Sequence, residues 1–231
     1  MNMNKIYISP SDLAFLYHES KWGFHQKYIL GVKRPPVILP KIFTLIDSFI
    51  KTKYMGQNLN IINKNLPNAI LSSNDEWVVS KPIINSDYPE ISIQIRGKID
   101  AVFDHQDGSY SVIDFKTSEI NEAYLEKYKN QLHAYSYAVL NPESSSKFSL
   151  PNLKNTGLLV FAPDEFYIDY NDRCGLKGNF KWVEFELNLD EFENFIKQEL
   201  IPLLAGPEPK PEENDNCWVY LKQFGFEYQQ E

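Results

Sequence analysis

The residues best suited to chemistry are two acids, Asp100 and Asp114, and a lysine, Lys116. Alternating apolar residues flank Asp107-Gly108, a pair typical of a tight β-hairpin turn. If residues 106–108 form the loop, with the glycine in the left-handed conformation, Asp100 lies directly opposite Asp114. Side chains two residues apart in a strand share a face, so Lys116 lies beside Asp114. The sequence therefore predicts two carboxylates and an ammonium group together on one sheet face.

Such a grouping favours a metal site for phosphate chemistry. Two facing carboxylates repel each other unless a positive charge lies between them, and Mg²⁺ typically takes one or two carboxylates plus phosphate oxygens. A neighbouring lysine can orient or deprotonate water, or neutralise charge developing on phosphorus. The alternative is a surface hairpin with a salt bridge between Asp100 and Lys116. The apolar flanks, Val112-Ile113 and residues 101–103, favour a buried site, because buried charge is rare unless paired or ligating.

Three motifs in order carry a family resemblance: Gly97-x-Ile99-Asp100, then Ile113-Asp114-Phe115-Lys116-Thr117-Ser118, then Gln131-x-x-x-Tyr135. Together they resemble the PD-(D/E)XK nuclease superfamily, with RecB-type nuclease domains and CRISPR-associated exonucleases as the nearest branch. The resemblance covers about residues 9–205. It implies an α/β (α+β), restriction-endonuclease-like core, with a mixed central sheet, an antiparallel meander and flanking helices.

The residues and the resemblance together assign roles. Asp100 and Asp114, with the Phe115 carbonyl as a further oxygen ligand, are expected to hold Mg²⁺ or Mn²⁺ while Lys116 positions the nucleophile. Gln131 is expected to orient the scissile phosphate.

The helix predicted over residues 119–140 carries Gln131 and Tyr135. Apolar residues repeat at spacings of three and four along it, and Gln131 and Tyr135 share a face. Both side chains are therefore expected to reach the sheet edge, where Tyr135 contacts the strand backbone; the alternative for Tyr135 is plain core packing.

The sequence departs from the family at two places. A metal-binding histidine is common on the helix that we predict over residues 41–54, and none is present; Asp47 falls near its position as a substitute ligand. The alternative for Asp47 is an ion pair with Lys51, four residues on. Iron–sulfur members carry a cysteine where this chain has residues 18–20, and a cysteine group near Cys217 is missing. No iron–sulfur cluster is expected.

Composition bounds the partners of the chain. Its 231 residues suffice for one sizeable α/β domain, and the net charge is −8. Residues 1–70 hold nine Lys/Arg against three Asp/Glu, whereas residues 71–231 hold fourteen against twenty-eight. This asymmetry is compatible with a basic N-terminal face for phosphates beside an acidic body. Without an 18-residue apolar run or a signal-peptide pattern, the expected location is cytoplasmic, with no membrane partner.

The N-terminal part combines aromatic and basic residues. Ser9 and Pro10 predict a helix start, and a second helical stretch ends at Gly31. Aromatic residues here alternate with cations that suit base stacking and phosphate contact. The candidate nucleic-acid-binding residues are Lys21, Trp22, Lys27, Lys33 and Arg34. The alternative is a core face edged with solvated lysines.

Other segments complete the expected domain, 1–206, whose helical N-terminal part spans about residues 9–60. Strands are expected at residues 77–80 and 91–95, the latter running into the Asp100 strand as part of a three-stranded antiparallel meander, and at 156–161 and 182–187. Residues 63–74 and 167–179 are expected to be loops, and Asp190 is expected to cap a last helix. The tail, 207–231, is Pro- and Glu-rich, with a short docking helix at 217–226.

The resulting hypothesis is a metal-dependent DNA nuclease, an exonuclease on single-stranded or end-containing DNA. Relatives point to a partner protein of a repair, replication or CRISPR system. One alternative is a catalytically reduced nuclease fold that binds nucleic acid or serves assembly, which the absent histidine motivates. The other is an unrelated metal-binding or carbohydrate-acting enzyme, which would not explain a lysine two residues after the second acid.

Overall fold

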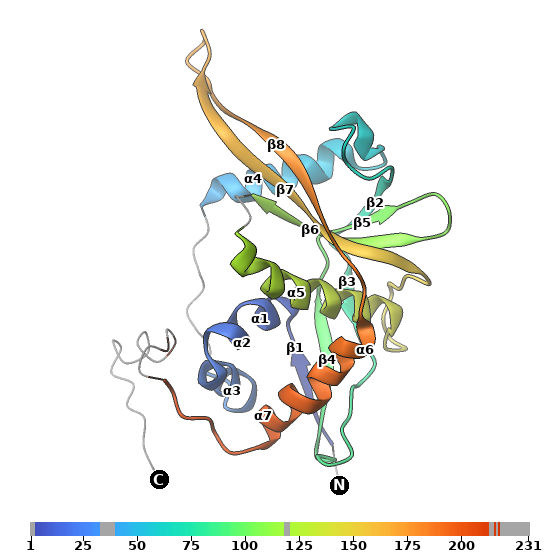
Figure 1. Ribbon diagram of the computed structural model, residues 1–231, viewed down its shortest axis with the longest axis vertical. Helices are drawn as coiled ribbons and strands as arrows, with labels where there is room; N and C mark the ends of the chain where they lie inside the picture. The colour runs from blue at the N-terminus through green and yellow to red at the C-terminus, as the bar shows by residue number, and fades with distance from the viewer. Residues whose placement is uncertain (1–2, 33–39, 118–120, 213–214, 216, 218–231) are drawn as a thin grey trace.

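The computed structural model describes residues 3–32, 40–117, 121–212, 215 and 217, and it contains two sheets with helices packed against them (Figure 1). The larger sheet has the strand order β2-β5-β6-β7-β8, and the smaller has the order β1-β4-β3. The strands are β1 (Asn4–Ile8), β2 (Ile70–Asn74), β3 (Trp77–Val79), β4 (Ile91–Lys98), β5 (Ala101–Asp104), β6 (Tyr110–Thr117), β7 (Leu153–Ile168) and β8 (Cys174–Phe185).

Both sheets mix parallel and antiparallel pairs. In the larger sheet β6 and β7 run parallel while the other neighbours run antiparallel, and in the smaller sheet β1 runs parallel to β4. The helical elements are α1 (Pro10–Ala14), α2 (Leu16–Glu19), α3 (Lys21–Ile29), α4 (Lys41–Tyr54), the 3-10 turn η1 (Leu59–Ile61), α5 (Glu122–Leu140), α6 (Leu189–Phe195), the π-helical turn η2 (Ile196–Leu200) and α7 (Ile201–Ala205). The mixed α/β fold class predicted from the sequence is confirmed.

The β5–β6 hairpin has the predicted register. Ala101 faces Ile113, and the His105 N–H donates to the Ser109 carbonyl at 3.1 Å. Gly108 has a φ of +84°, as its place in the three-residue loop requires. This register brings Asp100, the residue before β5, level with Asp114.

The chain changes sheets at Asp100. The sequence predicted one strand running from Ile91 through this residue, but the structure divides it into β4 and β5. β4 pairs with β1 and β3, whereas β5 pairs with β2 and β6. The backbone at the break bonds to the loop after β2, since the Ile99 N–H donates to the Glu76 carbonyl at 2.9 Å. Asp100 therefore lies where the two sheets separate.

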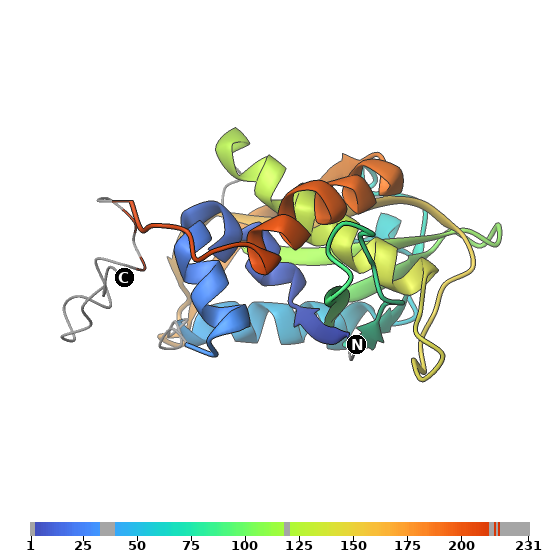
Figure 2. The same ribbon diagram turned by 90° about the horizontal axis from the view of Figure 1, so that it is seen from below.

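Helices α4 and α5 lie on opposite sides of the larger sheet (Figure 2). The α4 side buries alternate residues of β6, including Ile113 and Phe115, in a cluster with Ile50 of α4. On the other side, Leu132 of α5 packs with Leu158 and Val160 of β7. Because side chains alternate along β6, Asp114 and Lys116 point to the α5 side.

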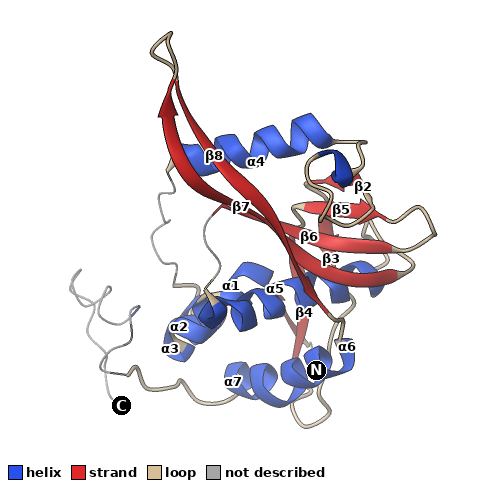
Figure 3. Cartoon of the chain, turned by 45° about the horizontal axis from the view of Figure 1, so that its top comes forward, coloured by secondary structure: helices blue, strands red, loops and turns tan. Residues whose placement is uncertain are grey.

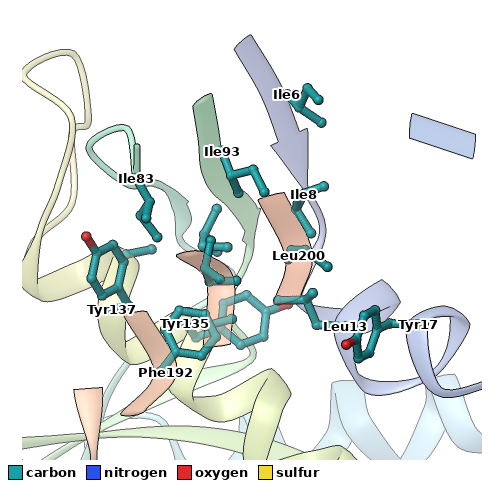
Figure 4. Close-up of a cluster of buried hydrophobic side chains, with 14 of the residues drawn as sticks. Ile6, Ile8, Leu13, Tyr17, Ile83, Ile93, Tyr135, Tyr137, Phe192 and Leu200 are labelled. Atoms are coloured by element: carbon teal, nitrogen blue, oxygen red, sulfur yellow. The ribbon is translucent and has the colours of Figure 1, made fainter. Parts of the chain in front are cut away.

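A second core joins the smaller sheet to the remaining helices (Figure 4). The isoleucines of β1 and β4 pack with Leu13 of α1 and with residues of α5, α6 and η2, including Tyr135, Phe192 and Leu200. Ser9 precedes α1 with an extended conformation and Pro10 occupies its first turn, as predicted. The α4 bounds match the predicted helix, and α5 matches within the described residues.

Three expectations for the connecting segments were wrong. Residues 167–179 lie mostly in a long β7–β8 hairpin, paired up to Ile168 and Cys174, that projects beyond the rest of the chain (Figure 3). Both of its faces are largely exposed there, so no buried alternation marks it in the sequence. Residues 70–74 form β2 rather than loop, and Asn188, not Asp190, caps α6 by accepting from the Glu191 N–H. The docking helix predicted at 217–226 lies outside the described residues, apart from Cys217.

Candidate metal and phosphate site

The site begins with Asp100, held at the division of the sheets. Its Oδ2 accepts a hydrogen bond from the Phe115 backbone N–H at 3.1 Å, across the gap between β5 and β6. Asp114 lies on β6 and is only 4% exposed, and its Oδ2 forms an ion pair with the Nζ of Lys116. The structure therefore brings together the two carboxylates and the ammonium group that the sequence singled out.

Burial and charge shift the protonation of this pair. Burial, together with the charge of Asp100, raises the pKa of Asp114 to about 6, although the Lys116 ammonium opposes the shift. Burial disfavours the Lys116 ammonium, but the Asp114 carboxylate outweighs it and the pKa of Lys116 is raised. Lys116 is thus a cation at neutral pH, and its Nζ lies 5.0 Å from the ring centroid of Tyr128.

Lys51 of α4 forms a second cationic centre, although the sequence indicated it only as a partner of Asp47. Its side chain is 9% exposed, and its Nζ lies 3.1 Å from Asp47, 3.2 Å from Asp75 and 3.4 Å from Asp100. Asp75 also pairs with Lys98 at 3.2 Å. The spacing of Asp47 and Lys51 indicated one of these contacts; Asp75 is distant in sequence, so no local pattern could reveal the others.

Asp47 forms the ion pair with Lys51 that was the alternative to its role as a metal ligand. It pairs with Lys51 across one helical turn, and its side chain is 38% exposed. Burial raises the pKa of Asp47, and Lys51 partly offsets the effect. Within the described residues no three His, Cys, Asp or Glu side chains gather in a way that holds a metal, so Asp47 does not complete a three-side-chain ligand set with Asp100 and Asp114.

Gln131 and Tyr135 of α5 lie between the carboxylates and α1. The Gln131 amide Nε2 donates to Ser11 Oγ at 3.3 Å, while its buried Oε1 has no partner among the described residues. Tyr135 is 6% exposed and packs in the core, and burial together with the charges of Asp114 and Asp100 raises its pKa. Both interpretations of Tyr135 thus have support: it is a core residue, and it lies within the field of the carboxylates.

The predicted nucleic-acid-binding residues of α3 have different surroundings. Trp22 is 1% exposed and donates to Glu208 at 2.7 Å, so its ring is not available for stacking on a base. Lys21 lies over the ring of Tyr17, and burial lowers its pKa to about 8. Lys27 pairs with Asp12 at 2.6 Å. The other two residues of the prediction, Lys33 and Arg34, lie outside the described part of the chain.

A hollow of about 330 Å³ opens beside the site, and Asp100 and Lys116 line it while Asp114 does not. Its lining combines Asp100, Lys116 and the β6 residues next to them with residues of α4, among them Phe43 and Asp47. The acid and ammonium groups of this lining, together with its aromatic and hydroxyl groups, suit a phosphate ester held against a cation.

The donor set fits a hard divalent cation. Asp100, Asp114 and the Phe115 backbone carbonyl supply oxygen only, the ligand type that Mg²⁺ and Mn²⁺ prefer. Two carboxylates are the usual number for Mg²⁺, which completes its shell with water and phosphate oxygens. Burial, followed by the charge of Asp100, raises the pKa of Asp114, and a cation bound to the two carboxylates would oppose that shift. These residues would hold the metal.

Comparison with known proteins agrees with this fold. The family model described as the PD-(D/E)XK nuclease superfamily matches residues 63–218. The chain belongs to this superfamily, and membership implies a nuclease that acts on nucleic acid, in a family that typically uses a divalent metal ion.

Similarity to individual proteins is low. A solved structure described as "Crystal structure of SSO0001" has 16% sequence identity and a TM-score of 0.43, over 94% of this chain and 84% of that chain. No curated protein matches the chain. Among the described residues, no helix has both the length and the apolar character to cross a membrane.

Proposed function

We propose that this chain is a divalent-metal-dependent deoxyribonuclease, acting as an exonuclease on single-stranded or end-containing DNA. The observation that carries the proposal is the group formed by Asp100, Asp114 and Lys116, of which Asp100 and Lys116 line one hollow. The proposal includes kinship with the RecB-type and CRISPR-associated branch, which the three sequence motifs resemble. It also includes a cytoplasmic location and a partner protein of a repair, replication or CRISPR system.

Each residue of the group has a distinct role. Asp100 and Asp114 would hold a divalent ion, which when bound would supply Lewis-acid stabilisation of the charge that develops on the phosphate. Lys116 keeps its proton because Asp114 raises its pKa, so it acts by its charge and its N–H donors rather than as a base. It orients the attacking water and stabilises the transition state. Gln131 presents a buried amide oxygen that can accept a hydrogen bond from a water molecule beside the phosphate.

A second candidate function is a catalytically reduced fold that binds nucleic acid without cleaving it. The observation in its favour is the cation already on Asp100: the Lys51 ammonium lies 3.4 Å from Oδ1, on the helix that would otherwise supply a further metal ligand. The retained Asp114 and Lys116 favour the enzyme, because a binding module gains nothing from a buried acid with a raised pKa.

The test is cleavage of end-labelled single- and double-stranded DNA with Mn²⁺, Mg²⁺ or EDTA. We expect metal-dependent cleavage by the wild type and a loss of at least about a hundredfold in Lys116→Ala, the size of effect typical of a removed stabilising donor. Lys81→Ala is the matched control, since Lys81 is exposed and has no ion pair within the described residues. The product ladder separates exonuclease from endonuclease. Metal-independent binding without cleavage supports the reduced fold instead.

A further inference from the structure

A second hollow, of about 520 Å³, lies on the outer face of the smaller sheet. Tyr7 of β1, Trp77 of β3 and both Arg96 and Lys98 of β4 contribute to its lining. The strand pairing places Trp77 directly opposite Lys98, and residues 96 and 98 share one face of β4. The opposite face carries Ile93 and Ile95 into the core, and on the Arg96 face Ser92 and Gln94 are buried, so only the end of the strand at Arg96 and Lys98 is open.

The aromatic side chains of this hollow are unusually open. Trp77 is 60% exposed and Tyr7 is 41% exposed, although both rings are of the type that normally dominates cores and interfaces. The guanidinium carbon of Arg96 lies 5.5 Å from the Tyr7 ring centroid and 5.8 Å from that of Trp77. An arginine between two exposed rings forms a flat platform with one positive charge.

The hollow is basic although the chain is acidic. Among the described residues, Arg96 has no carboxylate partner, and Lys98 has only Asp75, which it shares with Lys51. Asp12, the one acid of the lining, is already occupied by the Lys27 ammonium at 2.6 Å and by the Tyr28 hydroxyl. Positive charge beside stacking surfaces is the combination that binds single-stranded nucleic acid.

The hollow adjoins the catalytic group. Tyr135 contributes to its lining and at the same time feels the charges of Asp114 and Asp100. Gly97 lets β4 pack closely against Tyr135, because a Cβ there would lie 3.0 Å from Tyr135 Cε1 and 2.9 Å from Pro10 Cδ. A chain of ion pairs also joins Lys98 to Asp100 through Asp75 and Lys51.

We propose that this hollow binds the single-stranded part of the DNA substrate next to the scissile phosphate. A nucleobase stacks on Trp77, Arg96 and Lys98 contact the adjoining phosphates, and the strand continues past Tyr135 to the carboxylates. Paired bases have no free faces, so the exposed ring selects an unpaired strand over a duplex. This inference rests on the proposed nuclease function and names its preferred substrate.

The experiment measures binding of a fluorescently labelled oligothymidylate and of a duplex by anisotropy, in EDTA so that metal-dependent cleavage is absent. We expect Trp77→Ala to weaken single-strand binding roughly tenfold, with little change for the duplex. Arg96→Ala should also weaken binding and reduce the salt slope by about one. Trp77→Phe should retain most of the affinity. Tyr170→Ala and Arg173→Ala, exposed residues near the tip of the β7–β8 hairpin, serve as controls and should bind like the wild type.

The outcomes separate this inference from the proposed function. If the wild type cleaves DNA but Trp77→Ala and Arg96→Ala bind the single strand normally, the subsite is overturned and the nuclease stands. The subsite is equally overturned if the hairpin variants lose as much affinity as the variants of the hollow, or if the wild type binds only duplex. A wild type that neither binds nor cleaves DNA overturns both proposals.

Discussion

Asp114 is the residue of the site on which burial and neighbouring charges act together. It is almost fully buried, it lies near a second carboxylate, and one ammonium group is its direct partner. Burial of a charge is costly unless it is paired, and here the pairing leaves one negative charge more than Lys116 neutralises. Burial is the main cause of its raised pKa and the charge of Asp100 adds to it, so a divalent cation on the two carboxylates would lower this pKa.

Metal affinity should therefore depend on pH through Asp114. Its pKa in the metal-free protein is about 6, so the carboxylate form prevails above this pH and the protonated form below it. Protons compete with metal for the same oxygen atoms; we expect Mn²⁺ affinity to be level above about pH 7 and to fall roughly tenfold per unit below pH 6. Calorimetry in buffers of different ionisation enthalpy measures both the affinity and the proton released.

Asp114→Asn is the control for this titration. The amide cannot ionise and is a poorer ligand for a hard cation, so Mn²⁺ binding should be weaker by at least about tenfold and flat between about pH 5 and 7. A wild-type affinity that does not change over that range would show that another group, and not Asp114, governs binding.

Prediction from the sequence succeeded best where geometry is local. The three-residue loop fixes the register of β5 and β6, and the period of two places Lys116 beside Asp114, so the core of the site follows from one short stretch. Lys51 illustrates the limit. Its i,i+4 pair with Asp47 is a local feature, but the contacts with Asp75 and Asp100 arise because the chain changes sheets at Asp100, and no residue pattern marks that change.

At the scale of elements, α4 supports the site by placing one buried cation, Lys51, beside it. The helix packs Ile50 against the sheet, and the next residue, Lys51, lies among three carboxylates from α4, the loop after β2 and the start of β5. The Lys51 ammonium therefore links α4, the loop after β2 and the residue before β5 through ion pairs. Its ion pair with Asp100 also helps to hold one of the two carboxylates of the site in place.

Lys51→Met should destabilise the metal-free protein by about 1–2 kcal/mol, because it leaves three carboxylates without their shared cation. The acids are 31–43% exposed, so water screens part of the repulsion and the loss stays below that of a fully buried pair. Urea unfolding at about pH 7.5 measures the change. Lys98→Met is the matched control: Lys98 pairs only with Asp75 among the described residues and is 47% exposed, so its loss should be under about 0.5 kcal/mol. Equal losses would contradict a special role for Lys51.

Two elements, the β7–β8 hairpin and α3, differ from what their sequence patterns predicted. The β7–β8 hairpin was expected to be a loop because glycine and polar residues fill residues 169–179, yet the two strands pair beyond the sheet. An exposed hairpin satisfies its backbone by pairing alone, so it needs no alternation of apolar and polar side chains. α3 shows the converse. Its aromatic and basic composition suggested a nucleic-acid surface, but the ring of Trp22 is buried and the open rings lie on β1 and β3 instead.

For the whole molecule, the decisive feature is that two sheets meet at the site. The larger sheet supplies Asp114 and Lys116, the smaller sheet supplies the basic outer hollow, and Asp100 lies at the break between β4 and β5. α5 contacts both sheets and carries Gln131 and Tyr135 to the same place. A metal ion held by Asp100 and Asp114 joins the break between the two sheets to β6, so its binding should stabilise the fold as a unit.

Mn²⁺ should therefore raise the thermal midpoint of unfolding of the whole chain. A ligand that binds only the folded state at about a hundred times its Kd adds about 2.7 kcal/mol, which for a chain of this size corresponds to roughly 5–10 °C. The shift should appear in a single transition, disappear with EDTA, and fall to about half or less in Asp114→Asn. If instead only part of the transition moves, the two sheets unfold separately and the site depends on the larger sheet alone. An unshifted wild type at millimolar Mn²⁺ would remove the metal from the proposed function.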